Sequence, residues 1–362
     1  MKKPGIREIA KLANVSPGTV DRALHGRKGI TGETRRRILA IAESLGYTPD
    51  LAARALSVGR APVHIGVSIP REIHHYFDRL LAGIRSEANR FERLGVKLFY
   101  SPTERLGRDD VQKASELLAQ QPDALILTPG NPCALAPLID EAESRGIRVV
   151  CVDTDAPASK RSSAVCINPV VCGRLAAELM AGFLPQGSDA VVVTGMLDVE
   201  DHAKKTEGFT ALYAEVGGGD VQLIEAHEDE DEAFQKCFAL LSGSNSVAGI
   251  YVNTVNSLPV CRAIGAAGLA GRIKVITTDL FAGMVPFFER GVIAASIHGR
   301  PFAQGEIAVR LILDHLLNGR QLPKERLLMP QVVMRSNLHY FPEISGSTAE
   351  QPAPVFVEAI EL

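Results

Sequence analysis

The stretch IREIAKLANVSPGTVDRAL, residues 6–24, decides the fold of the N-terminal part of this 362-residue chain. Its first half places apolar residues at i, i+3, i+4 and i+7, as on one face of a helix: Ile6, Ile9, Ala10 and Ala13. Ser16 can then cap a second helix, and Pro17 can begin it because a first-turn residue needs no backbone N–H. The stretch therefore predicts two short helices joined by a tight turn.

A third helix is predicted next, capped by Thr31 and ended by Gly46. Its expected buried stripe is Ile38, Leu39, Ala42 and Leu45. Two helices joined by a tight turn and supported by a third form a helix-turn-helix unit. We therefore predict an all-α helix-turn-helix domain over residues 1–48. Residues 49–61 are too few for a stable isolated helix, so they are predicted to be a linker that becomes helical on binding.

Charge is unevenly distributed along the chain. The first 60 residues carry 12 Lys/Arg and 5 Asp/Glu, a net charge of +7, and the remaining 302 carry 27 and 37, a net charge of −10. The overall value of −3 hides this division. A basic head on an acidic body is expected where one end of a protein binds a polyanion.

From Val63 onward, apolar strand-like runs alternate with amphipathic helical segments. The predicted strands are 63–69, 96–100, 124–128, 149–153, 165–168, 190–194, 222–225, 249–253, 274–278 and 294–297. The predicted helices are 80–94, 111–120, 135–145, 173–184, 206–216, 258–267 and 304–317. This alternation is typical of α/β domains with parallel sheets, and so many strands exceed a usual single sheet. We expect two doubly wound parallel sheets, forming two lobes with a cleft between them, over residues 62–340, and a loosely held tail at 341–362.

Several protein classes are disfavoured. No apolar run approaches the roughly 18 residues that a membrane helix needs, and the first residues lack the apolar core of a signal peptide, so a cytoplasmic protein with no membrane partner is expected. The six cysteines have no C-x-x-C pairs or histidines at metal spacing and are interpreted as reduced core residues. No G-x-S-x-G, H-E-x-x-H or phosphate-cradling glycine motif occurs, so we expect no enzyme, no metal and no cofactor.

Three stretches carry a resemblance to the LacI/GalR family of bacterial transcriptional regulators: residues 6–24, TRRRIL at 34–39 and LGYTP at 45–49. The part of the chain after the linker is similar to periplasmic sugar-binding proteins of the ribose type. The resemblance implies a DNA-binding head and a two-lobed periplasmic-binding-protein-like domain that binds a small effector.

Within this resemblance, the second helix enters the DNA major groove. The residues it places at the DNA are Ser16, Pro17, Gly18, Thr19, Asp21 and Arg22, with 17, 18 and 22 at base edges and 16 and 19 at phosphates. The forked guanidinium of Arg22 can bond both acceptors of a guanine edge, although a solvated surface arginine is the alternative. Pro17 and Gly18 offer no polar side chain. Asp21 replaces the family's common serine, and its carboxylate can either hold Arg22 or accept from a cytosine amino group.

Leu56 matches the family's hinge leucine, which the resemblance implies is wedged into the minor groove at the operator centre. An apolar wedge unstacks a base step and kinks the duplex. A leucine that packs on the effector domain is the alternative. Because the linker is too short to hold its own helix, its folding is expected to couple to DNA and to the second subunit. A ligand that moves the lobes would then control DNA binding.

The resemblance also implies a set of effector-binding residues at strand ends and in the first loop: His74, Tyr76, Phe77, Asp153, Asn168, His202, Asn253 and Asp279. Asp279 ends an apolar strand, where parallel sheets place ligands, although it could instead cap the next helix. His202 and His298 are each left open between ligand contact and a structural role, and Lys205 is expected to be a solvated helix residue. Thr154 stands where ribose binders often have arginine, which argues against ribose itself.

The carboxylate run at residues 228–232 could bind a cation, but a solvated loop and helix start is the favoured interpretation. Together these features predict a ligand-responsive repressor of a sugar or polyol utilisation operon. It would bind a palindromic operator as a homodimer, with a tetramer possible, because one monomer reads only a half-site. The alternatives are a solute-binding or sugar-handling protein without a DNA role, and a regulator with a purine-like effector. The identity of the effector, the operator sequence and the direction of the response are not encoded in any recognisable motif.

Overall fold

The computed structural model describes residues 6–24, 29–45, 62–243 and 246–345. The head contains three helices: α1 (Ile6–Leu12), α2 (Pro17–Leu24) and α3 (Gly32–Ser44). The strands of the body are β1 (His64–Ser68), β2 (Lys97–Tyr100), β3 (Ala124–Leu127), β4 (Arg148–Val152), β5 (Ser163–Ile167), β6 (Asp189–Thr194), β7 (Val221–Glu225), β8 (Val247–Val252), β9 (Lys274–Thr277), β10 (Ile293–His298), β11 (Glu325–Leu328) and β12 (Gln331–Val333). Its main helices are α5 (His74–Asn89), α6 (Asp110–Leu118), α7 (Pro132–Ser144), α8 (Pro169–Phe183), α9 (Glu200–Glu215), α10 (Glu230–Gly243), α11 (Ser257–Ala266), α12 (Val285–Glu289), α13 (Pro301–Asn318) and α14 (Pro342–Ser345).

The three head helices pack on one small apolar core, as predicted. That core consists of Ile9, Ala10, Ala13, Val20, Ala23, Ile38 and Ala42. The Ser16 side chain caps α2 by accepting from Thr19 N at 3.2 Å, and Thr31 caps α3 by accepting from Thr34 N at 3.3 Å. The prediction that Leu39 belongs to the buried stripe of α3 is wrong, because its side chain is 43% exposed. Leu39 lies about 100° from Ile38 around the helix axis and so points away from the core.

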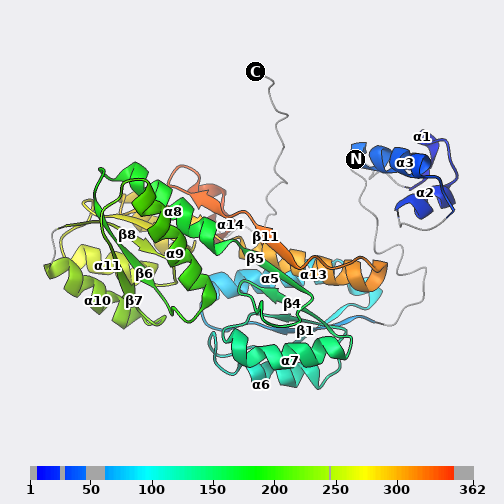
Figure 1. Ribbon diagram of the computed structural model, residues 1–362, viewed down its shortest axis with the longest axis horizontal. Helices are drawn as coiled ribbons and strands as arrows, with labels where there is room; N and C mark the ends of the chain where they lie inside the picture. Colours follow the sequence, from blue (N-terminus) through cyan, green and yellow to red (C-terminus); the bar gives the residue numbers. More distant parts are fainter. Residues whose placement is uncertain (1–5, 25–28, 46–61, 244–245, 346–362) are drawn as a thin grey trace.

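The body consists of two lobes, each built on a six-stranded sheet. The strand order is β11-β5-β4-β3-β1-β2 in lobe 1 and β12-β10-β9-β8-β6-β7 in lobe 2. All pairings are parallel except that of β10 with β12. The chain passes from one lobe to the other three times, after β5, after β10 and after β11, and Figure 1 shows the lobes side by side.

Helices cover both faces of each sheet. In lobe 1, α5 packs with α13 and α6 packs with α7, on opposite faces of the sheet (Figure 1). In lobe 2, α8 packs with α9 and α10 packs with α11. The approach of α8 and α9 requires Gly173, since a Cβ there would lie 2.0 Å from the carbonyl oxygen of Lys205.

The two-sheet architecture confirms the predicted fold class, but β11 and β12 were not predicted. Both are short strands at sheet edges, and three of the four residues of β11 are exposed, so neither has the continuous apolar run that marks a central strand. The packed chain also continues past residue 340: Phe341 is buried, and α14 lies within the segment predicted as a tail.

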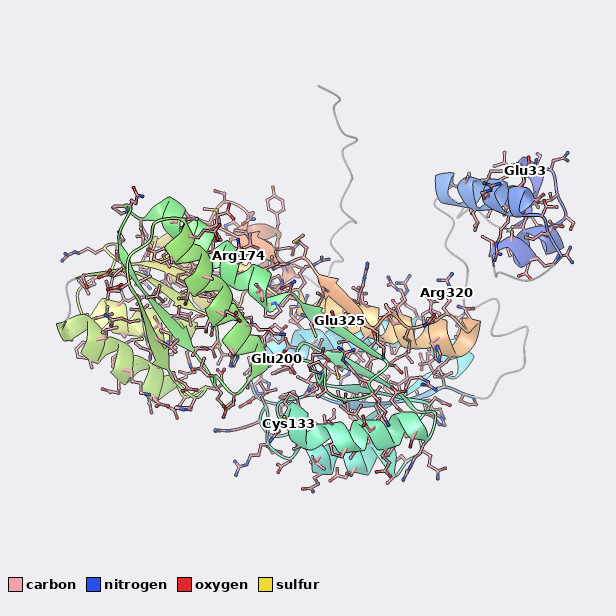
Figure 2. All side chains as sticks on the ribbon, in the orientation of Figure 1. Glu33, Cys133, Arg174, Glu200, Arg320 and Glu325 are labelled. Carbon is pink, nitrogen blue, oxygen red and sulfur yellow. The ribbon has the colours of Figure 1, made fainter. Side chains whose placement is uncertain are left out.

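The cysteines are free in the described part of the chain, and five of the six are buried. Burial raises the pKa of the Cys151 thiol to about 12, which makes it unreactive at neutral pH. Cys133 corrects the prediction that all are core residues, because it lies exposed on α7 at the surface of lobe 1 (Figure 2).

The linker 49–61, with Leu56, and residues 346–362 lie outside the described residues.

Candidate functional site: an interlobe pocket and a polar helix face

The first turns of α2 present a connected polar face. Ser16 Oγ and Thr19 Oγ1 are 2.9 Å apart, and the Arg22 guanidinium donates to Thr19 Oγ1 at 3.4 Å. Pro17, Gly18 and Arg22 are exposed, whereas Thr19 and Asp21 are half-buried. The Arg22 side chain is therefore already oriented before it meets DNA. This orientation reduces the conformational entropy that the side chain loses when it binds a base edge.

A pocket lies between the two lobes. Lobe 1 and the crossing after β10 line it with Ile73, Tyr76, Phe77, Leu106, Asp153, Thr154, Ile167 and Gly299. Lobe 2 lines it with Asp201, His202, Lys205, Glu228, Asn253, Thr254, Val255, Thr278 and Asp279. The carboxyl ends of the parallel strands lie at one end of each sheet, and residues that follow strands of both sheets, such as Asp153 and Asn253, line this pocket.

On the lobe 1 side, Asp153 comes directly after β4 in a left-handed backbone conformation with φ 67°. Such a conformation is costly for a residue other than glycine and is maintained by specific contacts. Asp153 N donates to Gln304 Oε1 at 3.0 Å, and Gln304 Nε2 donates to Tyr76 Oη at 3.2 Å. Tyr76 in turn donates to Asp153 Oδ1 at 2.5 Å. The fully buried Gln304 on α13 thus positions both pocket residues.

The Asp153 carboxyl is electrostatically unusual. Burial raises its pKa to about 7, Asp201 and Asp279 add to the rise, and the hydrogen bond from Tyr76 and the charge of Lys205 oppose it. The same burial, together with Asp153, raises the pKa of Tyr76 well above its usual value. At neutral pH Asp153 is therefore poised between its neutral and ionised forms.

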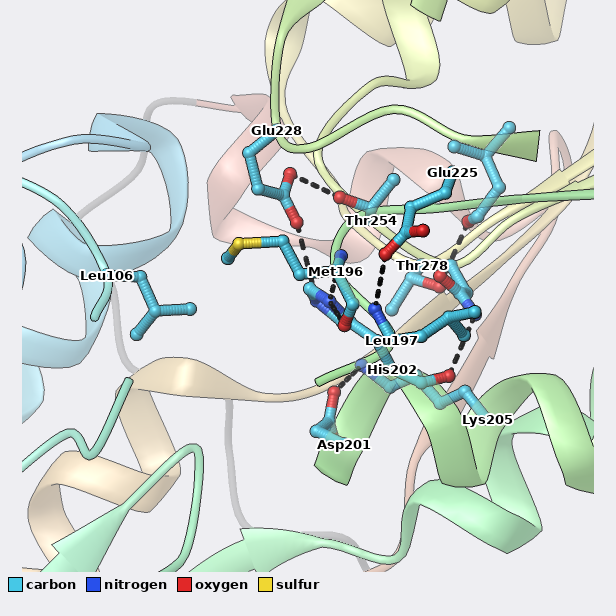
Figure 3. A network of polar contacts seen from close by, with 12 residues as sticks. Leu106, Met196, Leu197, Asp201, His202, Lys205, Glu225, Glu228, Thr254 and Thr278 are labelled. Carbon is cyan, nitrogen blue, oxygen red and sulfur yellow. Dashed lines mark hydrogen bonds and ion pairs between the residues drawn. The ribbon is translucent and has the colours of Figure 1, made fainter. Parts of the chain in front are cut away.

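On the lobe 2 side, α9 supplies an ion pair inside the pocket. Lys205 Nζ lies 2.5 Å from Asp201 Oδ2, and the two side chains are only 8% and 15% exposed (Figure 3). Burial lowers the pKa of Lys205, but the charge of Asp201 more than offsets this, and the net pKa is raised. Lys205 is therefore charged at neutral pH.

A second network on this side joins His202 to Glu228. His202 Nδ1 lies 3.1 Å from Met196 N and 3.2 Å from Met196 O, and its Nε2 lies 3.4 Å from Glu228 Oε1 (Figure 3). Thr254 donates to the other oxygen of Glu228. Gly195 makes room for this contact, since a Cβ there would lie 2.0 Å from Glu228 Oε1.

One contact crosses from lobe 1 to lobe 2 beside the pocket. His75 Nε2 lies 3.3 Å from Asp279 Oδ2, and the His75 ring packs on Phe281 with centroids 4.0 Å apart. Asp279 does not cap the next helix, because the N-cap position there is Phe281.

Six of the eight predicted effector-binding residues line the pocket: Tyr76, Phe77, Asp153, His202, Asn253 and Asp279. His74 does not line it; its side chain is 80% exposed and pairs with Asp78. Its neighbour His75 faces Asp279 instead, because adjacent residues point about 100° apart on a helix. Asn168 is also outside the lining, because its Oδ1 caps α8 by accepting from Val171 N. Contact of any of these residues with an effector stays a prediction.

Other expectations need correction. Lys205 is buried and lines the pocket, although a solvated position was expected. His298 is buried outside the lining, where its Nε2 lies 3.7 Å from Glu343 and burial lowers its pKa. Glu228 belongs to the pocket and not to a solvated loop.

The residues that the sequence reasoning missed are Asp201, Gln304 and His75. Asp201 and Lys205 are spaced i, i+4 near the start of α9, and this spacing was overlooked because the helix was expected to begin six residues later.

Within the described ranges no cluster of His, Cys, Asp and Glu could hold a metal ion. The helices in those ranges include none that is long and apolar enough to cross a membrane.

Comparison with known families covers both parts of the chain. Residues 65–321, most of the chain, match the periplasmic binding protein domain, and residues 5–50 match the bacterial regulatory proteins of the lacI family. The chain is a LacI-family regulator.

Known proteins resemble this LacI-family regulator over most of its length. The ribose operon repressor of Haemophilus influenzae is 23% identical over 343 residues, which cover 92% of this chain and 98% of that protein. Catabolite control protein A of Priestia megaterium is 23% identical over 253 residues, covering 69% of this chain and 73% of that protein. A solute-binding protein of Burkholderia graminis C4D1M, solved with D-arabinose, superposes with a TM-score of 0.71 at 21% identity, covering 77% of this chain and 97% of that one. The last of these supports the fold alone.

Proposed function

We propose that this LacI-family regulator represses an operon for the use of a sugar or polyol, and that it binds a palindromic operator as a homodimer. The supporting observation is the presence, in one chain, of a helix-turn-helix head with a polar α2 face and of a pocket lined by both lobes. The named relatives include a ribose operon repressor. The protein would act by binding, not by catalysis, and in the cytoplasm, where its operator lies.

The proposed switch depends on the fact that the pocket residues come from both lobes. Asp153 belongs to lobe 1, and Lys205 and Asn253 belong to lobe 2, so a ligand that contacts all three binds one lobe arrangement better than others. A ligand shifts a conformational equilibrium by its difference in affinity for the two states. The linker 49–61 connects the lobes to the head, and we propose that the lobe arrangement controls whether two linkers fold together on DNA, with Leu56 in the minor groove.

The primary test is site-selective DNA binding. Gel shifts with genomic fragments at moderate salt should reveal a palindromic site, and a chain lacking residues 1–60 should keep ligand binding but lose DNA binding. If the full chain binds no fragment selectively, a solute-binding role without DNA replaces the proposal.

Replacing Arg22 with alanine should relax operator specificity at one base pair per half-site. The guanidinium is exposed and directed by Thr19, and a bidentate contact to guanine is worth about 1–3 kcal/mol of discrimination. Binding of single-base operator variants to R22A measures the loss. The matched control is Arg36→Ala, which removes the same charge from the exposed face of α3. Equal, sequence-independent weakening by both variants would show that Arg22 contacts only phosphate.

Operator affinity should fall steeply with salt. The first 60 residues carry a net charge of +7, and each phosphate that they neutralise releases condensed counterions. Leu56→Ala should lower affinity without changing this slope, because the wedge is apolar. Affinity measured over a series of salt concentrations checks both statements, and a flat salt dependence would contradict the assignment of the head to DNA.

A further inference from the structure

Acidic side chains outnumber basic ones in the lining of the pocket. Four carboxylates line it: Asp153, Asp201, Glu228 and Asp279. Among the described residues of the lining, the only fixed positive charge is Lys205, and no arginine is present. Lys205 is already paired with Asp201. The histidines His202 and His75 each face a carboxylate, but an imidazole is not a fixed positive charge.

Most donors of the pocket are also committed to protein acceptors. Every side chain of the described lining that can donate makes at least one such contact within the protein: Tyr76 to Asp153, Thr154 to Pro129 O, His202 to Glu228 or Met196 O, Lys205 to Asp201, Asn253 to His202 O and Thr206, Thr254 to Glu228, and Thr278 to Val252 O. Apart from the remaining N–H groups of Lys205, the pocket thus offers acceptors to a ligand more readily than donors. A neutral hydroxyl brings two acceptor lone pairs for each proton, and purine ring nitrogens also need donors.

Two acceptors have capacity that the protein leaves unused. The Asp153 carboxylate accepts from Tyr76, but no ion pair to it is formed by the described residues. Asn253 is 1% exposed, both protons of its Nδ2 are used, and its Oδ1 has no hydrogen-bond partner within the described part of the chain. A buried acceptor without a partner is costly unless a ligand supplies the donor. Asp153 and Asn253 line the same pocket from opposite lobes.

We propose that the effector is a polyhydroxylated amine, an amino sugar or amino polyol, whose protonated amine lies against Asp153. An ammonium group brings three donors, no acceptor and one positive charge, which are what this lining lacks. The apolar side chains of Ile73, Leu106 and Val255 line the same pocket and can pack on the carbon skeleton. The inference rests on the proposed function, because it names the effector class of the same site.

The test compares amines with their neutral counterparts. Thermal unfolding of the full chain is measured with D-glucosamine, D-galactosamine and 1-amino-1-deoxy-D-glucitol, each beside its parent hydroxyl compound and its N-acetyl derivative. At least one amine should raise Tm more than both neutral counterparts. Calorimetry near pH 6 should also show proton release on binding of that amine, since Asp153 must ionise. The proposal is overturned if no amine exceeds its neutral counterparts, or if binding releases no proton.

Substitution of Asp153 locates the amine. Asp153→Asn keeps the shape of the side chain and an acceptor for Tyr76, but removes the charge. A hydrogen bond to a charged group is worth enough that the amine should bind about 10- to 100-fold more weakly, with a smaller loss for the neutral parent. The matched control is Glu200→Gln, which removes one charge from an exposed side chain at the start of α9, outside the pocket lining (Figure 2). Equal losses for amine and parent in D153N would place the amine elsewhere and overturn the proposal.

The same preparations separate the effector class from the DNA role. If a neutral sugar changes operator binding and no amine does, the proposed repressor function stands and the proposed amine effector is refuted. If an amine binds but the full chain shows no selective DNA binding, the inference about the pocket is supported and the proposed repressor function is refuted.

Discussion

Replacing Lys205 with methionine should lower the free energy of unfolding of the two-lobed body by about 3–5 kcal/mol, because removing one partner of a buried ion pair leaves a buried charge uncompensated. Lys205 and Asp201 are 8% and 15% exposed, so solvent screens the pair poorly. Methionine retains the apolar length of lysine and leaves no large cavity. Urea unfolding followed by tyrosine fluorescence or circular dichroism measures the loss.

The neighbouring residue offers the control. Lys204 pairs with Glu200, but both side chains are more than 40% exposed, so Lys204→Met should change stability by less than about 1 kcal/mol. The double variant Lys205→Met with Asp201→Asn should recover part of the loss, since it removes the uncompensated charge. A K205M protein as stable as K204M would show that the ion pair is not buried as described.

Replacing Asp153 with asparagine should stabilise the protein at alkaline pH while it weakens binding of the proposed amine effector about 10- to 100-fold. The carboxyl has a pKa of about 7 in the folded protein. Its value in an unfolded chain is about 3.9, and a difference of this size corresponds to about 4 kcal/mol of destabilisation once Asp153 is ionised. Unfolding free energies of D153N and the native sequence at pH 8 measure this difference.

The direction of the pH effect is set by proton binding. Between about pH 4 and pH 7 the folded state binds more protons at Asp153 than the unfolded state does, so this residue makes stability fall as pH rises through that window. Below it, both states are protonated and the penalty vanishes. D153N should therefore differ little from the native sequence at pH 4 and most at pH 8. A constant difference at all pH values would indicate an effect of packing and not of ionisation.

This predicted gain in stability has a functional interpretation. An uncharged residue at position 153 would suit the folded chain better at neutral pH, and a binding site often retains groups that cost stability. The left-handed backbone of Asp153 and the buried Gln304 that maintains it are consistent with a position kept for its ligand.

The strand ends could be predicted well from the sequence, and the side-chain directions less well. Asp153, Asn253 and Asp279 come after apolar strands and line the pocket, while their contact with an effector stays a prediction. Asn168 also comes after a strand, yet it caps α8, because Pro169 begins a helix directly after it. Both kinds of position look alike along the chain, and only the packing of the next helix separates them.

By itself, the sequence determined what depends on near neighbours: the helix-turn-helix head with its Ser16 and Thr31 caps, and the alternation of strands and helices in the body. Caps and periodic stripes act within a few residues, so they can be read along the chain. Only the tertiary structure decided which charged groups share the pocket. Asp201, Glu228 and Gln304 come from distant segments, and their burial, pairing and committed hydrogen bonds arise where segments of both lobes meet at one pocket. Electrostatic balance is a property of that assembled space, because both the dielectric environment and the distances between charges are set by packing.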